Sequence, residues 1–120
     1  MTWFEDHLAQ QLKTTAQTWA AMQQHGATEQ SVLRLDFFYD ATSPEPLQRL
    51  KTWFDEQTDY ESEVVTNRTG LTRKRHYSLA GTTQLIAVSE EALLKWVEQM
   101  VTTGAEHGPA VFDGFSAVVS

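Results

Sequence analysis

The spacing of apolar residues switches along this chain between a helical period and a two-residue period, and this switching constrains the fold more than any other feature. From Thr2 to about His25 the spacing is helical and predicts one amphipathic helix, with Phe4, Leu8, Leu12, Trp19 and Met22 on one face. From Ser31 to Ala41 alternate residues are apolar, which predicts a strand. One face of that strand carries Leu33, Leu35, Phe37 and Tyr39, and the other carries Arg34, Asp36, Phe38 and Asp40.

The rest of the chain repeats this switch. Ser43-Pro44 is a typical helix start, and the apolar stripe behind it contains Leu47, Leu50, Trp53 and Phe54. Residues 60–67 and 71–79 are predicted to form an antiparallel hairpin through Asn67–Gly70, with Glu63 facing Arg75. Residues 82–88 are expected to continue the second strand past a bulge at Gly81. Ser89 begins a further helix that ends at His107-Gly108, and residues 110–119 have strand character.

The predicted order is therefore a helix followed by a β-α-β-β-α-β unit. Right-handed crossovers and a central hairpin arrange such a unit as a four-stranded antiparallel sheet with two helices on one face. We expect an α+β, ferredoxin-like sandwich with an extra N-terminal helix, whose placement over the other face or along an edge is open. At 120 residues the chain is the size of a single domain, with the helix in 1–26 and the ferredoxin-like unit in 31–119.

Composition restricts the classes of partner. Nine Lys and Arg against sixteen Asp and Glu give a formal charge of −7, which disfavours direct binding of nucleic acid and favours a basic protein surface. Without cysteine there is no disulfide, thiolate metal site or thiol nucleophile, as is common in a reducing compartment. The acidic start does not resemble a secretory signal, and no apolar run is long enough to span a bilayer. We expect a cytoplasmic protein.

No catalytic motif is recognisable. The six glycines are isolated, so no phosphate-binding loop is present, and the four histidines lack the spacing of a metal site. His25 and His107 each precede a glycine at a predicted helix end, which favours a capping role. No serine, histidine and carboxylate form a recognisable triad. We therefore expect no enzyme activity, no cofactor and no metal, with the scattered carboxylates left untested as acid catalysts.

Two features remain as candidates for binding. The cluster Arg73, Lys74, Arg75 and His76 is basic in an otherwise acidic chain; we interpret it first as charges that protect a strand edge and second as a ligand-binding patch. The second is the outward face of the first strand, with Arg34, Asp36 and Phe38. Its large aromatic side chain would be exposed unless the N-terminal helix or a partner covers it, and we interpret it first as covered within the core and second as a binding surface.

Several segments resemble the RraB family of regulators of ribonuclease E. The similarity extends from about Leu12 onward and includes residues 32–39, the helix with Leu47-Gln48-Arg49-Leu50, and the segment from Glu106-His107-Gly108 into the last strand. The family signature is tyrosine-aspartate-glycine-tryptophan. Here it reads Phe112, Asp113, Gly114 and Phe115, which keeps the aspartate and glycine and replaces both aromatic residues. The resemblance implies a cytoplasmic bacterial protein that binds ribonuclease E and lowers its RNA-cleaving activity without catalysis of its own.

Two alternatives belong to other classes. A small, acidic, cysteine-free domain is also suited to be an immunity protein or toxin neutraliser that masks a basic nuclease. A ferredoxin-like sheet can instead hold a small molecule on an open face, because a fold does not fix a function. The sequence also leaves open a homodimer through an exposed sheet face or edge.

Overall fold

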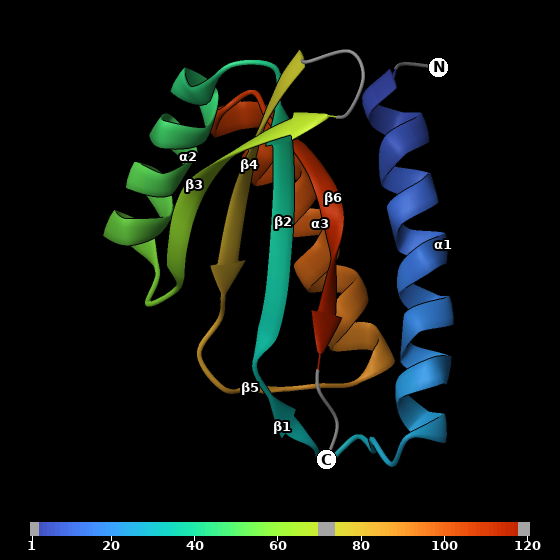
Figure 1. The fold of residues 1–120 in the computed structure, drawn as a ribbon. Coiled ribbons are helices and arrows are strands. Elements are labelled where there is room, and N and C mark those ends of the chain that lie inside the picture. Colours follow the sequence, from blue (N-terminus) through green and yellow to red (C-terminus); the bar gives the residue numbers. More distant parts are fainter. Residues whose placement is uncertain (1–2, 70–73, 118–120) are drawn as a thin grey trace.

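The computed structural model describes residues 3–69 and 74–117, which form an α+β fold of three helices and antiparallel strands (Figure 1). The helices are α1 (Trp3–Gln24), α2 (Pro44–Gln57) and α3 (Glu90–His107). The strands are β1 (Val32–Leu33), β2 (Leu35–Ala41), β3 (Glu61–Thr69), β4 (Lys74–Thr82), β5 (Ile86–Ala87) and β6 (Val111–Ala117). In the described ranges, no helix has the length and apolar character needed to cross a membrane.

Four strands form one antiparallel sheet in the order β3-β4-β2-β6. Helices α2 and α3 lie on the same face of this sheet, as the sequence predicts (Figure 1). Their starts are also as predicted: Pro44 is at the first position of α2, and the Ser89 side chain accepts a hydrogen bond from the Ala92 backbone N–H of α3. β1 and β5 form a separate two-stranded sheet, so the strand predicted from Ser31 to Ala41 is divided at Arg34.

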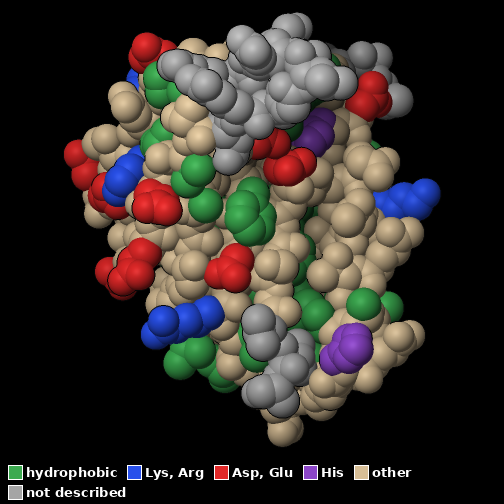
Figure 2. All heavy atoms as spheres, in the orientation of Figure 1, with side chains coloured by type: hydrophobic (Ala, Val, Ile, Leu, Met, Phe, Trp, Pro, Cys, Tyr) green, Lys and Arg blue, Asp and Glu red, His purple; other side chains and the backbone are tan. Residues whose placement is uncertain are grey.

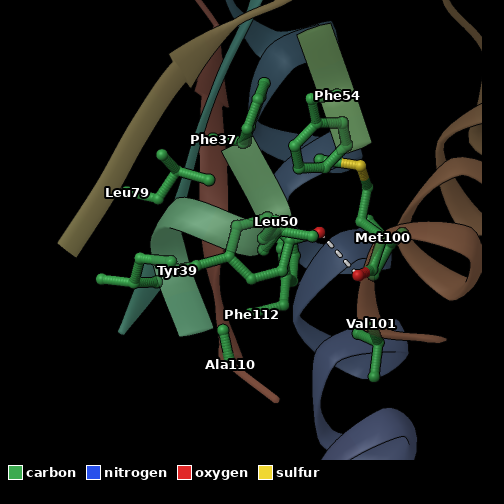
Figure 3. Close-up of a cluster of buried hydrophobic side chains, with 11 residues drawn as sticks. Phe37, Tyr39, Leu50, Phe54, Leu79, Met100, Val101, Ala110 and Phe112 are labelled. Carbon is green, nitrogen blue, oxygen red and sulfur yellow. Dashed lines mark hydrogen bonds between the residues drawn. The ribbon is translucent and has the colours of Figure 1, made fainter. Parts of the chain in front are cut away.

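The main core lies between the sheet and helices α2 and α3. Its centre is aromatic, with Phe37, Tyr39, Phe54 and Phe112 fully or almost fully buried (Figure 3). The Tyr39 hydroxyl donates a hydrogen bond of 2.6 Å to the Met100 backbone carbonyl, so it crosses from the sheet to α3. Burial raises the pKa of the Tyr39 phenol well above its ordinary value, and the nearby Tyr60 raises it further.

α1 extends along the β6 edge of the sheet and packs against α3 (Figure 1). Its buried residues Trp19 and Met22 form a second core cluster with Leu35 and Leu93. Near its start, the His7 ring Nε2 lies 2.8 Å from the Phe112 backbone carbonyl, a distance suited to a hydrogen bond. The placement of the N-terminal helix is therefore along an edge and against the helical layer.

The expected bulge at Gly81 is wrong. β4 passes through Gly81 in unbroken register with Phe37 of β2 and Ser62 of β3. A Cβ at Gly81 would lie 2.2 Å from the Phe37 ring, so the missing side chain makes room for that ring. The strand ends at Thr82 because Thr83 turns the chain: its hydroxyl accepts a 3.0 Å hydrogen bond from the Leu35 backbone N–H. Residues 86–87 then pair with β1 and do not extend β4.

The predicted pairing of Glu63 with Arg75 is also wrong. Glu63 lies opposite Ala80, and Arg75 lies opposite Arg68. The predicted loop residues Asn67–Thr69 belong to β3, so the hairpin closes later in the sequence than the Asn67–Gly70 pattern suggested. The register moves with the turn, since the turn position fixes which residues face each other in a hairpin. Residues 70–73, where the strands connect, lie outside the described part of the chain.

A bulge is present in β6 next to Gly114. Phe38 of β2 pairs with Gly114, but the next residue, Tyr39, pairs with Phe112, so β6 has one extra residue at this point. Gly114 has a φ of 119°, in the region that favours glycine. The extra residue allows Phe112 and Phe115 both to pack on the core, although an odd spacing in a regular strand would place them on opposite faces.

Candidate binding surface

The face of the four-stranded sheet that α2 and α3 leave uncovered is the candidate functional site, and we call it the outer face. Its centre is Phe38 of β2, which lies opposite Ala80 of β4 and Gly114 of β6. Figure 2 views the molecule from this side and shows acidic side chains gathered over the sheet with hydrophobic side chains among them. Strand alternation and register place the carboxylates of Asp36, Asp40, Glu61 and Glu63 on this face. Asp113, the extra residue of the β6 bulge, lies close to Asp40.

Phe38 is exposed, which corrects the expectation that α1 or the core covers it. It keeps 39% of its surface accessible. α1 borders the ring without covering it, because a small cavity of about 200 Å³ separates Thr14 and Thr18 of α1 from Phe38 and Gly114. The neighbours of Phe38 across the sheet are among the smallest residues available, so the ring stands above the backbone. An aromatic side chain held in this way is a typical binding anchor.

Hydroxyl groups on β4 hold the two β2 carboxylates in place. The Thr82 hydroxyl donates to one Asp36 carboxylate oxygen at 2.8 Å, and the Ser78 hydroxyl donates to one Asp40 carboxylate oxygen at 3.0 Å. Each carboxylate thus has a second oxygen outside these bonds. Two oriented carboxylates therefore flank Phe38 on the same strand.

The β6 bulge brings a further carboxyl group to Asp40. Partial burial raises the pKa of the Asp113 carboxyl above its usual value of 3.8, and Asp40 raises it further through its charge and through a hydrogen bond between the two side chains. His7 of α1 acts in the opposite direction and lowers that pKa. Asp113, the aspartate of the Phe112–Phe115 motif, therefore lies near Asp40 at the outer face, and folding disfavours its ionised form.

Two ion pairs among the described residues lie on the helices and not on the outer face. Lys51 pairs with Asp55 on α2 at 2.9 Å, and Lys95 pairs with Glu91 on α3 at 3.0 Å. Among the side chains that the structure describes, none of the outer-face carboxylates has a lysine or arginine within ion-pair distance. This face therefore concentrates negative charge beside an exposed aromatic ring.

Beside Phe38 the outer face is hollowed. The hollow has a volume of about 440 Å³ and is open to solvent. Phe38 and Asp36 line one side of it, and Glu61 and Glu63 of the edge strand line the other. Ala80, Gly81 and Thr82 of β4 lie between them, and their small size accounts for the depression.

A second hollow lies on the helical side, between α1 and α3. It has a volume of about 600 Å³, with Leu12 and Leu94 among its lining residues. Acidic residues also line it, but so does Lys95, which already pairs with Glu91. This hollow is therefore a weaker candidate for a cationic partner than the outer face.

The other predicted site residues do not converge on the outer-face hollow. Lys74, Arg75 and His76 begin β4 where it pairs with β3 alone, beyond the end of β2, and Arg73 lies outside the described residues. His107 stacks on Trp53 at 4.9 Å, and α1 ends one residue before His25. Within 3–69 and 74–117, no three His, Asp or Glu side chains are placed to hold a metal ion.

The acidic outer face was not predicted as a unit, although part of its signal is in the sequence. Asp36, Phe38 and Asp40 alternate along one strand, and Glu61 and Glu63 alternate along another. Only the strand order shows that these two sets share a face, separated by the small residues of β4. The proximity of Asp113 to Asp40 depends on the bulge and has no simple sequence signal.

Comparisons with known proteins do not assign this chain to a family. No protein-family model matches it, and no curated protein matches its sequence.

Proposed function

We propose that this chain is a non-enzymatic regulatory domain that binds a basic segment of another protein through its outer face. The observation that carries the proposal is the exposed Phe38 ring, surrounded by carboxylates that have no cationic partner among the described side chains. Exposed aromatic residues anchor protein interfaces, and complementary charge directs the encounter. The formal charge of −7 acts in the same direction over a longer range.

The proposal extends to the fold type and to the partner. In chain order, the four sheet strands β2, β3, β4 and β6 alternate with α2 and α3 as β-α-β-β-α-β, and the order β3-β4-β2-β6 places the first and third of them in the middle. This supports a ferredoxin-like classification with α1 added. With the resemblance of the last strand, it also supports an RraB-type regulator whose partner is ribonuclease E.

The test is direct binding to ribonuclease E. Calorimetry at low salt is expected to show a complex, and an RNA-cleavage assay is expected to show slower cleavage when the domain is added. Asp36→Asn with Glu63→Gln should weaken both effects, because these changes remove two charges from the outer face. Glu56→Gln with Glu106→Gln removes two charges from exposed positions on α2 and α3 and serves as the matched control.

The choice of partner and the choice of binding surface are tested by different outcomes. Absence of a complex at low salt contradicts the ribonuclease E assignment. A complex that both double variants weaken equally contradicts the outer face as the binding surface. In that case the attraction depends on net charge alone.

A further inference from the structure

The residues that line the hollow beside Phe38 are suited to bind a single cationic side chain. Its lining combines one exposed aromatic residue with three carboxylates, Asp36, Glu61 and Glu63. Glu61 and Glu63 are exposed on the edge strand, across β4 from Asp36 and Phe38. A cation that enters between these strands therefore meets an aromatic ring on one side and carboxylates on both sides.

The width of the hollow follows from the sheet. Adjacent strands are about 4.8 Å apart, so side chains on β2 and β3, with β4 between them, are separated by about 10 Å. The β4 residues in the gap are Ala80 and Thr82, and the Thr82 hydroxyl is already bonded to Asp36. A flat guanidinium group fits such a gap and can reach carboxylates on both sides. A bare metal ion requires ligands that converge, and no described group of His, Asp or Glu does so.

Arginine matches this lining better than lysine. A guanidinium group stacks on an aromatic ring and also donates two parallel hydrogen bonds to a carboxylate. The Thr82 hydroxyl holds one Asp36 oxygen and fixes the orientation of that carboxylate next to Phe38. Lysine offers a strongly hydrated point charge and cannot make both contacts with one flat surface.

We propose that the hollow binds an arginine side chain from an extended basic segment of the partner protein, with its guanidinium on the Phe38 ring and bonded to Asp36 and the β3 glutamates. This inference rests on the proposed function and specifies the chemistry of the same surface. The rest of the segment lies across the outer face. Its other positive charges then lie near Asp40 and Asp113, which are on the far side of Phe38 from Asp36.

The test uses two short synthetic peptides that differ only in their cation. One is acetyl-Ala-Arg-Ala-Arg-Ala-amide, and the other has lysine in place of both arginines. Each is titrated into the isotope-labelled full chain while the Phe38 ring and the Ala80 amide are followed by NMR. The arginine peptide is expected to shift both groups and to bind about two- to fivefold more tightly than the lysine peptide, the range of one exposed cation–π contact.

Substitution of the ring separates stacking from charge. Phe38→Leu keeps apolar bulk at an exposed position and should preserve the fold, but it should abolish the preference for arginine. Phe38→Tyr keeps the ring and should retain that preference. Glu61→Gln with Glu63→Gln should weaken both peptides, whereas the control Glu56→Gln with Glu106→Gln should have little effect.

These results are independent of ribonuclease E. A preference for arginine that Phe38→Leu removes supports arginine binding in the hollow even if ribonuclease E does not bind. In that case only the family assignment fails. Arginine binding in the hollow is contradicted by any of three results: equal affinity for the two peptides, an unchanged preference in Phe38→Leu, or no NMR shift at Phe38 and Ala80. If ribonuclease E binds nevertheless, the protein-binding function stands without the arginine site.

Discussion

Tyr39 joins the sheet to α3 through one hydroxyl group, which donates to the Met100 backbone carbonyl inside the core. Tyr39→Phe removes this hydrogen bond and keeps the ring that contacts Phe37 and Phe112. We expect the variant to fold and to lose about 0.5–1.5 kcal/mol of unfolding free energy, the usual net value of such a bond. Urea denaturation followed by tryptophan fluorescence measures the loss.

The same residue makes stability sensitive to alkaline pH. The folded-state pKa of Tyr39 is raised above 10.0, so folding favours its neutral form. Its contribution is therefore fully present below pH 10.0 and is lost as the pH rises from there through the folded-state pKa. Unfolding free energies measured across this range should fall less steeply for Tyr39→Phe than for the wild type. Parallel curves would show that other groups cause the alkaline loss.

At the scale of the element, the β6 bulge has an electrostatic cost because it partly buries Asp113 and places it beside Asp40. The raised pKa of Asp113 means that its ionised form is disfavoured in the folded state, so the penalty is present at neutral pH and absent below 3.8. Asp113→Asn should therefore stabilise the fold at neutral pH, with a gain that disappears in acid. Thermal melts at the two pH values test this. Asp59→Asn, in the loop before β3, is the control, and an equal gain there would contradict the pairing.

α1 provides a second test at this scale, because it has one tryptophan in the core and one at the surface. Trp19 is 3% exposed within the second core cluster, whereas Trp3 is 61% exposed. Trp19→Ala should cost about 3–5 kcal/mol, the usual range for a large aromatic residue removed from a core. Trp3→Ala should change stability by less than about 1 kcal/mol. Similar losses in both variants would contradict the packing of α1 on α3.

The order of elements and the antiparallel pairing of β3 with β4 could be predicted from the sequence, whereas the register of that pairing and the side-chain contacts could not. Helices and strands have different periods, and Ser43, Pro44 and Ser89 indicate where two helices begin. Hairpin register depends on the turn, and the polar residues Asn67 to Thr69 fit a strand as well as a loop. The role of Gly81 could not be inferred from its neighbours in sequence. The glycine is required because the Phe37 ring of the neighbouring strand occupies the space that a Cβ would need. The candidate surface was missed because it combines residues from several strands, and the strand order that brings them together is not visible in any one segment.

At the scale of the whole molecule, the salt dependence of the association rate distinguishes attraction by the net charge of −7 from attraction by the acidic outer face. Association with a basic peptide should slow as ionic strength rises, because the screening length falls from about 30 Å at 0.01 M to about 8 Å at 0.15 M. Stopped-flow rates should depend less on salt for Glu61→Gln with Glu63→Gln than for Glu56→Gln with Glu106→Gln. Equal slopes would assign the attraction to net charge and not to the face.

The one-sided core has a consequence for how such a domain changes over generations. The two core clusters lie against the helices, and Phe38, Glu61 and Glu63 project from the opposite face with little part in holding the chain folded. Exchanges at these positions should cost little stability, since exposed substitutions away from caps and cores are usually close to neutral. A lineage can therefore exchange one partner for another by altering a few exposed side chains while the same interior persists beneath them.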